Sequence, residues 1–302
     1  MRILIHLVML RGALALLACA AAALVATATA ARTQQDGMFS AGDAYERFMG
    51  RWSAELAPRL VRFAGLRDGD VILDVGSGTG ALTAAVAAAA PSSPIIGIDP
   101  AAAYVAFAQA RRLGDRVGFE VGDAQQLRFS DRHFDRTLAL LVLNFIPDPA
   151  KALTEMIRVT RPGGTVTAAV WDYSDGMDML RVFWDEAIAL RPDMEAHDER
   201  HMPLCRKGEL AALWREHRLQ NVAEKGLTIE TRFASFDDYW SPFLAKQGPA
   251  GTYAAALPAA AREQLRIRLR RRLLGDGPDR PIVLRARAWA VRGTVPSLPG
   301  AQ

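Results

Sequence analysis

The sequence predicts an α/β fold in which helices cover a mainly parallel sheet. Beyond residue 70, short apolar runs alternate with stretches of helical composition, as such a sheet requires. The first run, 71–75, leads into a turn with glycines at 76, 78 and 80 and then into an alanine-rich segment. The runs 95–98 and 137–142 are almost continuously apolar, which is typical of central parallel strands buried on both faces.

The first half of the chain supplies most of the predicted elements. A first helix is expected from Asp43 to Phe63. The motif Arg161-Pro162-Gly163-Gly164 ends one predicted helix and opens the next strand, since proline and glycine both interrupt helices. The predicted strands lie near 71–75, 94–98, 117–121, 133–142 and 164–171, and the predicted helices near 79–90, 101–112, 148–161 and 176–190.

The regular alternation breaks after residue 190, where a stretch rich in charge, proline and histidine begins. We expect a helical insertion at about 233–275, placed before the last strand of the sheet. The remaining predicted elements are a helix near 208–217, a strand near 221–232 and a final strand at 281–291. The predicted organisation is a leader at 1–37, one domain at 38–292 and a tail at 293–302.

The leader carries features of an export signal. The segment from Gly12 to Ala31 has no charge, lies between Arg11 and Arg32, and ends in an Ala-Thr-Ala sequence that resembles a cleavage site. Three interpretations stay open: a signal or membrane segment, a cleaved leader, or translation that starts at Met38. We expect a cytoplasmic protein, with export or membrane anchoring as the alternative.

Composition limits the classes of partner. The 302 residues are 50% hydrophobic and 23% charged, as in a globular enzyme. The net charge is +4, and it falls to +2 without residues 1–37, which hold three arginines and one aspartate. We therefore expect no nucleic-acid partner. The two cysteines, Cys19 and Cys205, leave one thiol in the predicted domain, so neither a disulfide nor a cysteine metal site is expected there.

The glycine turn predicts a nucleotide cofactor, because glycines let the backbone approach a ligand before a helix start. Gly76 to Ala81 also fits G-x-G-x-x-A, and Asp99 follows at a suitable distance, so a dinucleotide-binding dehydrogenase is one alternative. Two further acids favour a different cofactor. Asp74, at the end of the first strand, can accept from a cationic amino group, and Asp123, after the third strand, can accept from an adenine amine.

Taken together, these motifs resemble the class I S-adenosylmethionine-dependent methyltransferases. Within them, the chain is similar to the small-molecule group that includes the ubiquinone and menaquinone biosynthesis C-methyltransferases, over roughly residues 45–172. The resemblance implies a Rossmann-like seven-stranded sheet and S-adenosylmethionine as cofactor. It rests on Asp74-Val75-Gly76-Ser77-Gly78-Thr79-Gly80, Gly97-Ile98-Asp99, Gly122-Asp123-Ala124, Phe134-Asp135 and Arg161-Pro162-Gly163-Gly164.

The resemblance also implies roles for individual residues. Asp74 and Gly76 lie near the methionyl group, Asp99 accepts from both ribose hydroxyls, and Asp123 contacts the adenine. From the residues alone, Asp99 before Pro100 also makes a helix N-cap, and that alternative stays open. The implied cofactor-binding residues are Asp74, Gly76, Ser77, Gly78, Gly80, Asp99, Pro100, Asp123, Ala124, Leu141 and Asn144.

The segment from Tyr45 to Trp52 resembles the N-terminal helix that covers the cofactor in this family, which adds Tyr45 and Arg51 as cofactor contacts. The alternative is an amphipathic helix that docks Phe48 and Trp52 on the core.

The acceptor side of the site is less defined by the sequence. Methyl transfer needs mainly alignment, but a base helps some acceptors, and His197, His201, Tyr173 and Asp172 are candidates. The two histidines have an i,i+4 spacing that suits a metal on a helix, but prolines bracket them, so we expect a solvated surface run and no metal. Candidate substrate contacts are Trp171, Tyr239 and Trp240, and the alternative for the cluster from Phe236 is a helix capped by Ser235 with its aromatic side chains in the core.

The predicted function is methyl transfer to a small organic molecule by proximity and orientation. The alternatives are an RNA or protein methyltransferase, an NAD(P)-dependent oxidoreductase, and a cofactor-binding protein without catalysis. The expected partner is a small-molecule acceptor, with membrane contact only if the leader is retained. The basic stretch from Arg262 to Arg272 is interpreted as a solvated helix face, with a membrane or RNA contact as its alternative.

Overall fold

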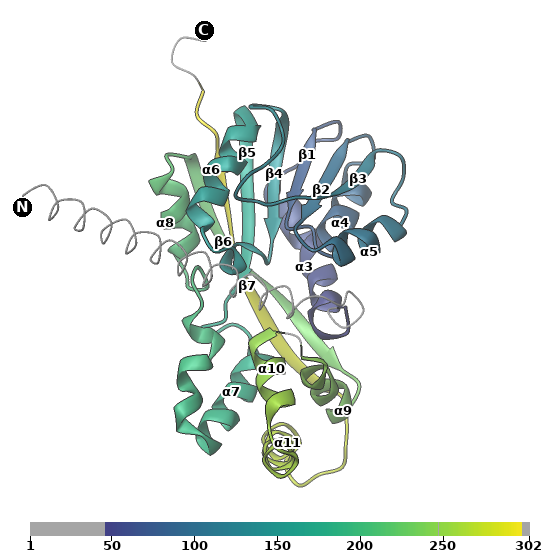
Figure 1. Cartoon of the computed structure of the whole chain (residues 1–302), viewed down its shortest axis with the longest axis vertical. Coiled ribbons are helices and arrows are strands. Elements are labelled where there is room, and N and C mark those ends of the chain that lie inside the picture. The colour runs from purple at the N-terminus through teal and green to yellow at the C-terminus, as the bar shows by residue number, and fades with distance from the viewer. Residues whose placement is uncertain (1–45, 247, 298–302) are drawn as a thin grey trace, which may run out of the picture. The chain divides into compact units, whose positions relative to one another are not determined.

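Figure 1 shows the computed structural model, which describes residues 46–246 and 248–297. The predicted leader at 1–37, the alternative start at Met38, the expected helix start at Asp43 and the candidate Tyr45 lie outside the described residues. Within the described part of the chain, no helix combines the length and the apolar character that crossing a membrane would need.

The sheet has seven strands in the order β3-β2-β1-β4-β5-β7-β6, which confirms the predicted fold class. The first five strands pair in parallel, while β7 runs antiparallel to both β5 and β6. The chain order reverses direction at β1, whose neighbours are β2 and β4, so the crevice beyond these strand ends is the expected ligand site of such a sheet. The strands are β1 (Ile72–Val75), β2 (Ile95–Asp99), β3 (Val117–Val121), β4 (Phe134–Leu140), β5 (Thr160–Trp171), β6 (Gln220–Phe233) and β7 (Ile282–Thr294).

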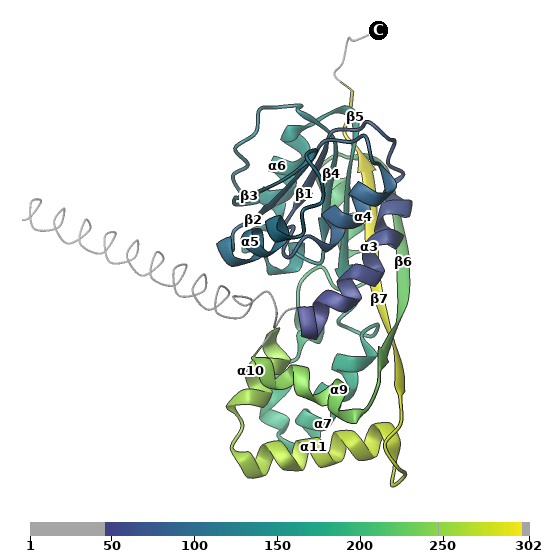
Figure 2. The ribbon, with the colours of Figure 1, turned by 90° about the vertical axis from the view of Figure 1, so that its right-hand side faces the viewer.

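Helices cover both faces of this sheet (Figures 1 and 2). Helices α3 (Arg51–Ala64), α4 (Ala81–Ala89) and α5 (Ala102–Ala110) lie on one face, and α6 (Pro149–Val159) and α8 (Glu209–Glu216) on the other. The apolar stripes of α3 and α6 explain this placement, since the residues they bury recur at helical spacing. A short π-helical turn, η1 (Glu46–Gly50), precedes α3, and a 3-10 turn, η2 (Leu143–Phe145), follows β4.

A helical cap lies beside the carboxyl end of β6 and the amino end of β7, as Figure 2 shows. It consists of α7 (Asp178–Leu190), η3 (Pro192–His197), η4 (Glu199–His201), α9 (Phe236–Trp240), η5 (Ser241–Ala245), α10 (Gly248–Ala256) and α11 (Ala259–Leu274). Aromatic rings hold it together: Phe183 of α7 stacks on Phe243 of η5 with ring centroids 4.5 Å apart.

Two strands are longer than the sequence predicts. β5 begins at Thr160, so the Pro-Gly-Gly motif lies inside the strand; at Gly164 a Cβ would fall 2.6 Å from the carbonyl oxygen of Asp135, and only glycine permits that approach. β7 continues to Thr294, because Gly293 and Thr294 pair with β5. The first two residues of the predicted tail therefore belong to the sheet.

Candidate cofactor-binding site

The glycine turn after β1 is held against β2 by backbone hydrogen bonds. The amides of Gly76 and Ser77 both donate to the carbonyl of Ile98 at 2.8 Å. Gly76 has a φ of 71°, and a Cβ there would lie 2.4 Å from Cγ2 of Val142. Position 76 thus requires glycine for two reasons: its backbone is in the left-handed region, and the turn after β4 leaves no room for a side chain.

Asp74 is fully buried at the end of β1. Its Oδ2 accepts from the Thr83 hydroxyl at 2.6 Å, while no described residue donates to its Oδ1. Burial raises the pKa of Asp74 to about 7, although the hydrogen bonds from Thr83 oppose this. A buried carboxylate with a free oxygen is suited to bind a cationic group, because such a partner would compensate its lost hydration.

Asp99, at the end of β2, organises the loops on both sides of it. Its Oδ2 accepts from the amide of Gly78 and its Oδ1 from the amide of Ala101, both at 2.9 Å. Burial raises the pKa of Asp99, against these two hydrogen bonds. Asp99 thus closes a local turn, but the alternative that it caps a helix beginning at Pro100 is wrong, because α5 begins at Ala102 and its N-cap is Ala101. Each carboxylate oxygen still has a lone pair for a ligand hydroxyl.

The neighbouring strands contribute the other predicted residues. Asp123, half-buried after β3, accepts from the amide of Gln125 at 2.9 Å, and Ala124 beside it is also half-buried. After β4, Leu141 adopts a φ of 61° and its amide donates to Ala169, which turns the chain toward the buried Asn144. The predicted residues therefore lie together at the edge of the sheet formed by the carboxyl ends of β1 to β4. Pro100, after β2, is exposed there.

The comparisons with known proteins agree with this arrangement. A family model described as a methyltransferase domain matches residues 73–168, which span β1 to β5. The ubiquinone/menaquinone biosynthesis C-methyltransferase of Bdellovibrio bacteriovorus is 36% identical over 110 residues, covering 36% of this chain and 47% of that protein. Residues 73–168 are thus a methyltransferase domain.

Two further similarities extend beyond the matched family region. An uncharacterised protein of Mycobacterium tuberculosis is 27% identical over 217 residues, covering 70% of this chain and 76% of that protein. The structure of phosphoethanolamine N-methyltransferase 2 of Haemonchus contortus, with phosphomonomethylethanolamine and S-adenosylhomocysteine, has a TM-score of 0.52 at 17% identity, covering 85% of this chain and 57% of that chain. This likeness concerns the fold alone, and the matched stretch spans about half the length of the Bdellovibrio enzyme.

The turn η1, before α3, reaches the glycine turn through a residue that we did not predict. Glu46 of η1 accepts from the hydroxyl of Thr79 and pairs with Arg111, just after α5, at 3.2 Å. The sequence gives one signal for Glu46: it lies in the segment from Tyr45 to Trp52, which resembles the N-terminal helix that covers the cofactor in this family. Arg51, which we expected to contact the cofactor, instead pairs with Asp238 of α9 at 2.9 Å.

The guanidinium of Arg51 also lies 4.3 Å from the ring centroid of Trp52 and 4.9 Å from that of Phe233. These contacts link α3 to the cap and to β6, and no contact of Arg51 with the glycine turn is present among the described residues. The physical reason is that Asp238 offers a direct charge partner beside two aromatic rings.

The candidate bases differ in their exposure and partners. Tyr173 is buried, while His197 and His201 are exposed, as expected for a solvated run. Asp172 accepts from Ser174 and pairs with Arg287 at 2.6 Å. Burial alone would raise the pKa of Asp172, but these partners hold it below its usual value, so Asp172 is a poor general base.

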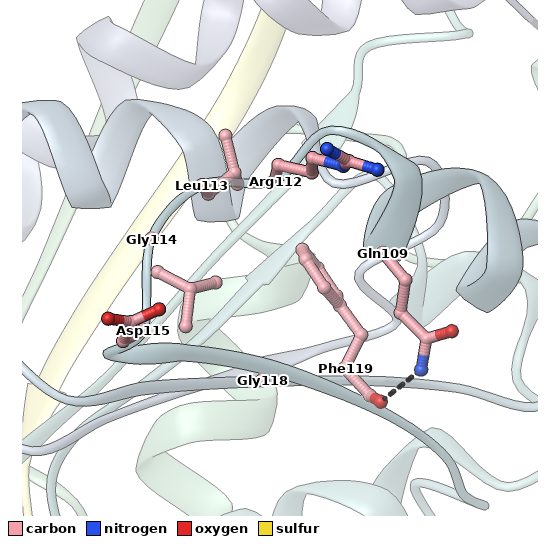
Figure 3. A pocket seen from close by; sticks show the side chains of 8 residues that line it. Gln109, Arg112, Leu113, Gly114, Asp115, Gly118 and Phe119 are labelled. Carbon is pink, nitrogen blue, oxygen red and sulfur yellow. Dashed lines mark hydrogen bonds between the residues drawn. The ribbon is translucent and has the colours of Figure 1, made fainter.

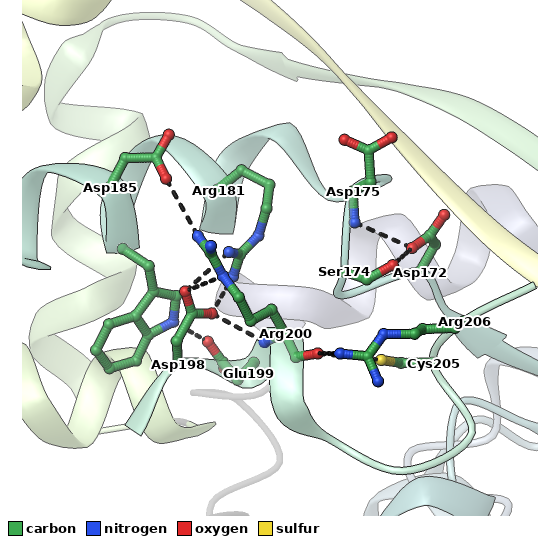
Figure 4. A network of polar contacts seen from close by, with 11 residues as sticks. Asp172, Ser174, Asp175, Arg181, Asp185, Asp198, Glu199, Arg200, Cys205 and Arg206 are labelled. Carbon is green, nitrogen blue, oxygen red and sulfur yellow. Dashed lines mark hydrogen bonds and ion pairs between the residues drawn. The ribbon is translucent and has the colours of Figure 1, made fainter. Parts of the chain in front are cut away.

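The expectation of a solvated run is wrong for the two acids between the histidines. Asp198 is buried and pairs with Arg181 and with Arg200, as Figure 4 shows. Glu199 is buried too and accepts from the indole of Trp184; burial raises the pKa of Glu199 to about 7. Within residues 46–246 and 248–297, no group of three or more histidine, cysteine, aspartate or glutamate side chains is arranged to hold a metal ion.

The predicted substrate contacts are core residues in this structure. Trp171 and Trp240 are buried, and Tyr239 is fully buried and donates its hydroxyl to the carbonyl of Met179 at 3.0 Å. Ser235 accepts from the amide of Asp238 and so caps α9, as the packing alternative predicted. The aromatic cluster therefore stabilises the cap and offers no exposed Tyr239 ring to a substrate.

A hollow of about 560 Å³ lies between the end of α5 and the beginning of β3, and Figure 3 shows the side chains that line it. Gln109 and Phe119, joined by a hydrogen bond, form one side of it, and Arg112 and Asp115 lie on the connecting loop. The hollow is at the amino end of β3, whereas Asp123 follows the carboxyl end. It is therefore separate from the cofactor-binding edge.

Proposed function

We propose that the chain binds S-adenosylmethionine and transfers its methyl group to a small organic molecule. The observation that carries this proposal is the series of carboxylates at neighbouring strand ends: Asp74 near the end of β1, Asp99 at the end of β2 and Asp123 after β3. Each carboxylate can accept hydrogen bonds from one part of the cofactor. From β1 to β3, the three carboxylates would meet the methionyl part, the ribose and the adenine in turn.

The residues at this edge fit the cofactor. The free Oδ1 of the buried Asp74 would accept from the ammonium of the methionyl part, and the buried hydroxyl of Ser77, which has no described partner, lies on the turn beside it. Asp99 would accept from the ribose hydroxyls, and Asp123 with Ala124 would meet the adenine. The backbone at Gly78 has open space where a Cβ would be, so a ligand can approach it there.

When bound, S-adenosylmethionine supplies a methyl group on a positively charged sulfur. The acceptor's lone pair forms the new bond to this methyl group, and the electron pair of the broken bond remains on sulfur as S-adenosylhomocysteine is formed. The chain's own residues hold and orient the reactants and exclude water, which is the main requirement for such a displacement.

A small acceptor is supported by the cap and by the charge of the chain. The cap helices α7 and α9 to α11 join the domain close to β6 and β7, and the chain's net charge of +4 is too small to hold a polyanion. The similar proteins named above include a ubiquinone/menaquinone biosynthesis C-methyltransferase and a phosphoethanolamine N-methyltransferase in complex with phosphomonomethylethanolamine. An RNA or protein acceptor remains the alternative outcome of an acceptor screen.

Calorimetric titration of the full chain with S-adenosylhomocysteine tests the cofactor assignment. We expect micromolar binding, no heat with NAD or NADP, and a loss of about tenfold or more in the Asp99→Ala variant, because buried charge-assisted hydrogen bonds are lost. Heat with NAD and none with S-adenosylhomocysteine would overturn the proposal. A second assay tests the acceptor class by measuring the transfer of labelled methyl groups. Its acceptors are an extract depleted of macromolecules and, separately, the RNA and protein fractions.

A further inference from the structure

Glu199 is a buried acid of the cap that the proposed reaction does not use. It is 4% exposed and has hydrogen-bond partners in α7 and α10. The indole N–H of Trp184 in α7 donates to its Oε2, and the backbone amide of Ala250 in α10 also donates to its carboxyl group. Glu199 therefore joins η4 to two helices of the cap, and both donors are neutral groups.

Arg181, the cation that faces Glu199 from α7, is already committed to the neighbouring acid. Both terminal nitrogens of Arg181 donate to Asp198, with Nη1 2.9 Å from Oδ2, and Figure 4 shows the two side chains pointing toward one another. Arg200 pairs with Asp198 as well, at 2.7 Å. Burial alone would raise the pKa of Asp198, but these arginines hold it below its usual value, so the charge of Asp198 is compensated.

Glu199 has no cation of its own. Burial raises the pKa of Glu199 to about 7; the hydrogen bond from Trp184 and the charge of Arg181 oppose this rise, and the charge of Asp198 adds to it. Ionisation of Glu199 therefore places a second negative charge inside the cap, next to Asp198, with hydrogen bonds from neutral groups as its direct partners.

The elements around Glu199 carry other ionisable side chains. The arginines stay charged at any pH at which the protein is folded. Burial raises the pKa of Tyr253 above its usual value, so this phenol stays neutral. Two exposed histidines flank the acids, and histidine can titrate near neutral pH, so they require a control. The set comprises Arg181 and Asp185 of α7, His197 of η3, Asp198, Arg200 and His201 at η4, and Tyr253 of α10.

We propose that Glu199 is a pH-sensitive latch of the cap: its neutral form joins η4 to α7 and α10, and its ionisation as the pH rises loosens η4. The direction follows from linkage. The stability that the bound proton contributes is fully present below the ordinary value of 4.5 and is lost as the pH rises through about 7. This inference goes beyond the proposed function and does not depend on it.

A looser η4 affects a contact between the cap and the sheet. Met202 follows η4, and its sulfur accepts from Nδ2 of Asn144, in the turn after β4, at 3.7 Å. The pairing of Asp198 with Arg181 persists when Glu199 ionises, because both groups are already charged. We therefore expect a local opening around η4 and α10, while the rest of the cap stays folded.

Hydrogen exchange followed by mass spectrometry tests the latch in the full chain. The amides of His201 and Met202 donate within η4, and the amide of Ala250 donates to Glu199 itself, so all three report its opening. With a pKa of 4.5 in the open state and about 7 in the closed state, the opening equilibrium should rise about tenfold between pH 6 and pH 8. The exchange rates are first corrected for their intrinsic dependence on pH.

Three variants assign this response to its source. Glu199→Gln keeps an acceptor oxygen and cannot ionise, so the change between pH 6 and pH 8 should shrink to less than about twofold. Glu186→Gln is the matched control, because Glu186 is a buried glutamate of α7 that pairs with Arg268 at 2.7 Å. The double variant His197→Gln/His201→Gln removes both histidines. Both controls should keep the full response.

A response that persists in Glu199→Gln, or that disappears in either control, would overturn the inference. An unchanged opening in the parent between pH 6 and pH 8 would overturn it as well, and this result needs no variant, so it decides the matter even if Glu199→Gln does not fold. Thermal unfolding confirms that each variant is folded before exchange is compared. None of these measurements involves the cofactor, so failure of the latch leaves the proposed function intact.

Discussion

Replacing Asp74 by asparagine should make the unliganded protein more stable at alkaline pH while weakening its binding of the cofactor. Asp74 is completely buried, and its pKa is raised from the ordinary value of 3.8 to about 7, mainly by burial. The folded protein therefore holds the proton to higher pH than the unfolded chain does. The stability that this proton contributes is fully present below pH 3.8 and is lost as the pH rises through about 7.

The magnitude follows from the size of this shift. At about 1.4 kcal/mol per pKa unit, ionisation of Asp74 costs the folded state roughly 4 kcal/mol once the pH exceeds the raised value. Asparagine does not ionise, and its amide oxygen can still accept from Thr83. Its buried N–H groups lack a described acceptor, which offsets about 1–2 kcal/mol of the gain. The net expectation at pH 8 is an increase of about 2–3 kcal/mol in the free energy of unfolding.

Urea denaturation of the parent and of Asp74→Asn at pH 4.5 and pH 8 measures this effect. The stability of the variant relative to the parent should rise by about 3 kcal/mol between the two pH values. Asp172→Asn serves as the control of opposite sign, because the partners of Asp172 lower its pKa and the carboxylate is the stabilising form. A relative stability of Asp74→Asn that does not change with pH would refute the burial argument.

Three further predictions concern the same site and the cap. The affinity for S-adenosylhomocysteine should fall as the pH is lowered below about 7, with proton release seen as a buffer-dependent binding enthalpy, because the ionised form of Asp74 binds the ammonium; a pH-independent affinity would contradict this. Gly76→Ala should lower the unfolding free energy by more than about 2 kcal/mol in urea titrations and Gly78→Ala by about 1 kcal/mol, since the added methyl group meets Val142 at the first position and open space at the second; equal losses would show that conformation alone decides. Tyr239→Phe should cost about 1 kcal/mol of stability through its lost hydrogen bond and leave the kcat and KM of methyl transfer unchanged, whereas a raised KM would return it to the substrate site.

The sequence predicts the sheet well where strand identity depends on local hydrophobicity. The apolar runs at β1, β2 and β4 are buried, so their pattern alone marks them as central strands. The start of β5 depends instead on Gly164 passing close to Asp135, and the end of β7 depends on pairing with Val166 and its neighbours. Such contacts join residues far apart in the chain, and a local pattern carries no signal for them.

The same distinction explains which site residues were predictable. Asp74 and Asp99 lie at the carboxyl ends of β1 and β2, and Asp123 follows β3, so the parallel topology alone brings them to one edge of the sheet. The partner of Arg51 could not be predicted from the topology. Asp238 lies 187 residues further along the chain, in a helix that the sequence predicts only as part of an insertion. A cation in a motif can be assigned to a ligand only when the anions of the rest of the fold are known.

The buried acids of the cap make this point most clearly. Asp198 and Glu199 stand in a run of charged residues bracketed by prolines, and composition assigns such a run to the surface. Burial becomes acceptable only because Arg181 and Trp184, one turn apart on α7, offer a guanidinium and an indole N–H to them. These two acids tie η4 to α7, and η4 leads to Met202, whose sulfur accepts from the side chain of Asn144, so polar contacts made within the cap extend to the turn after β4.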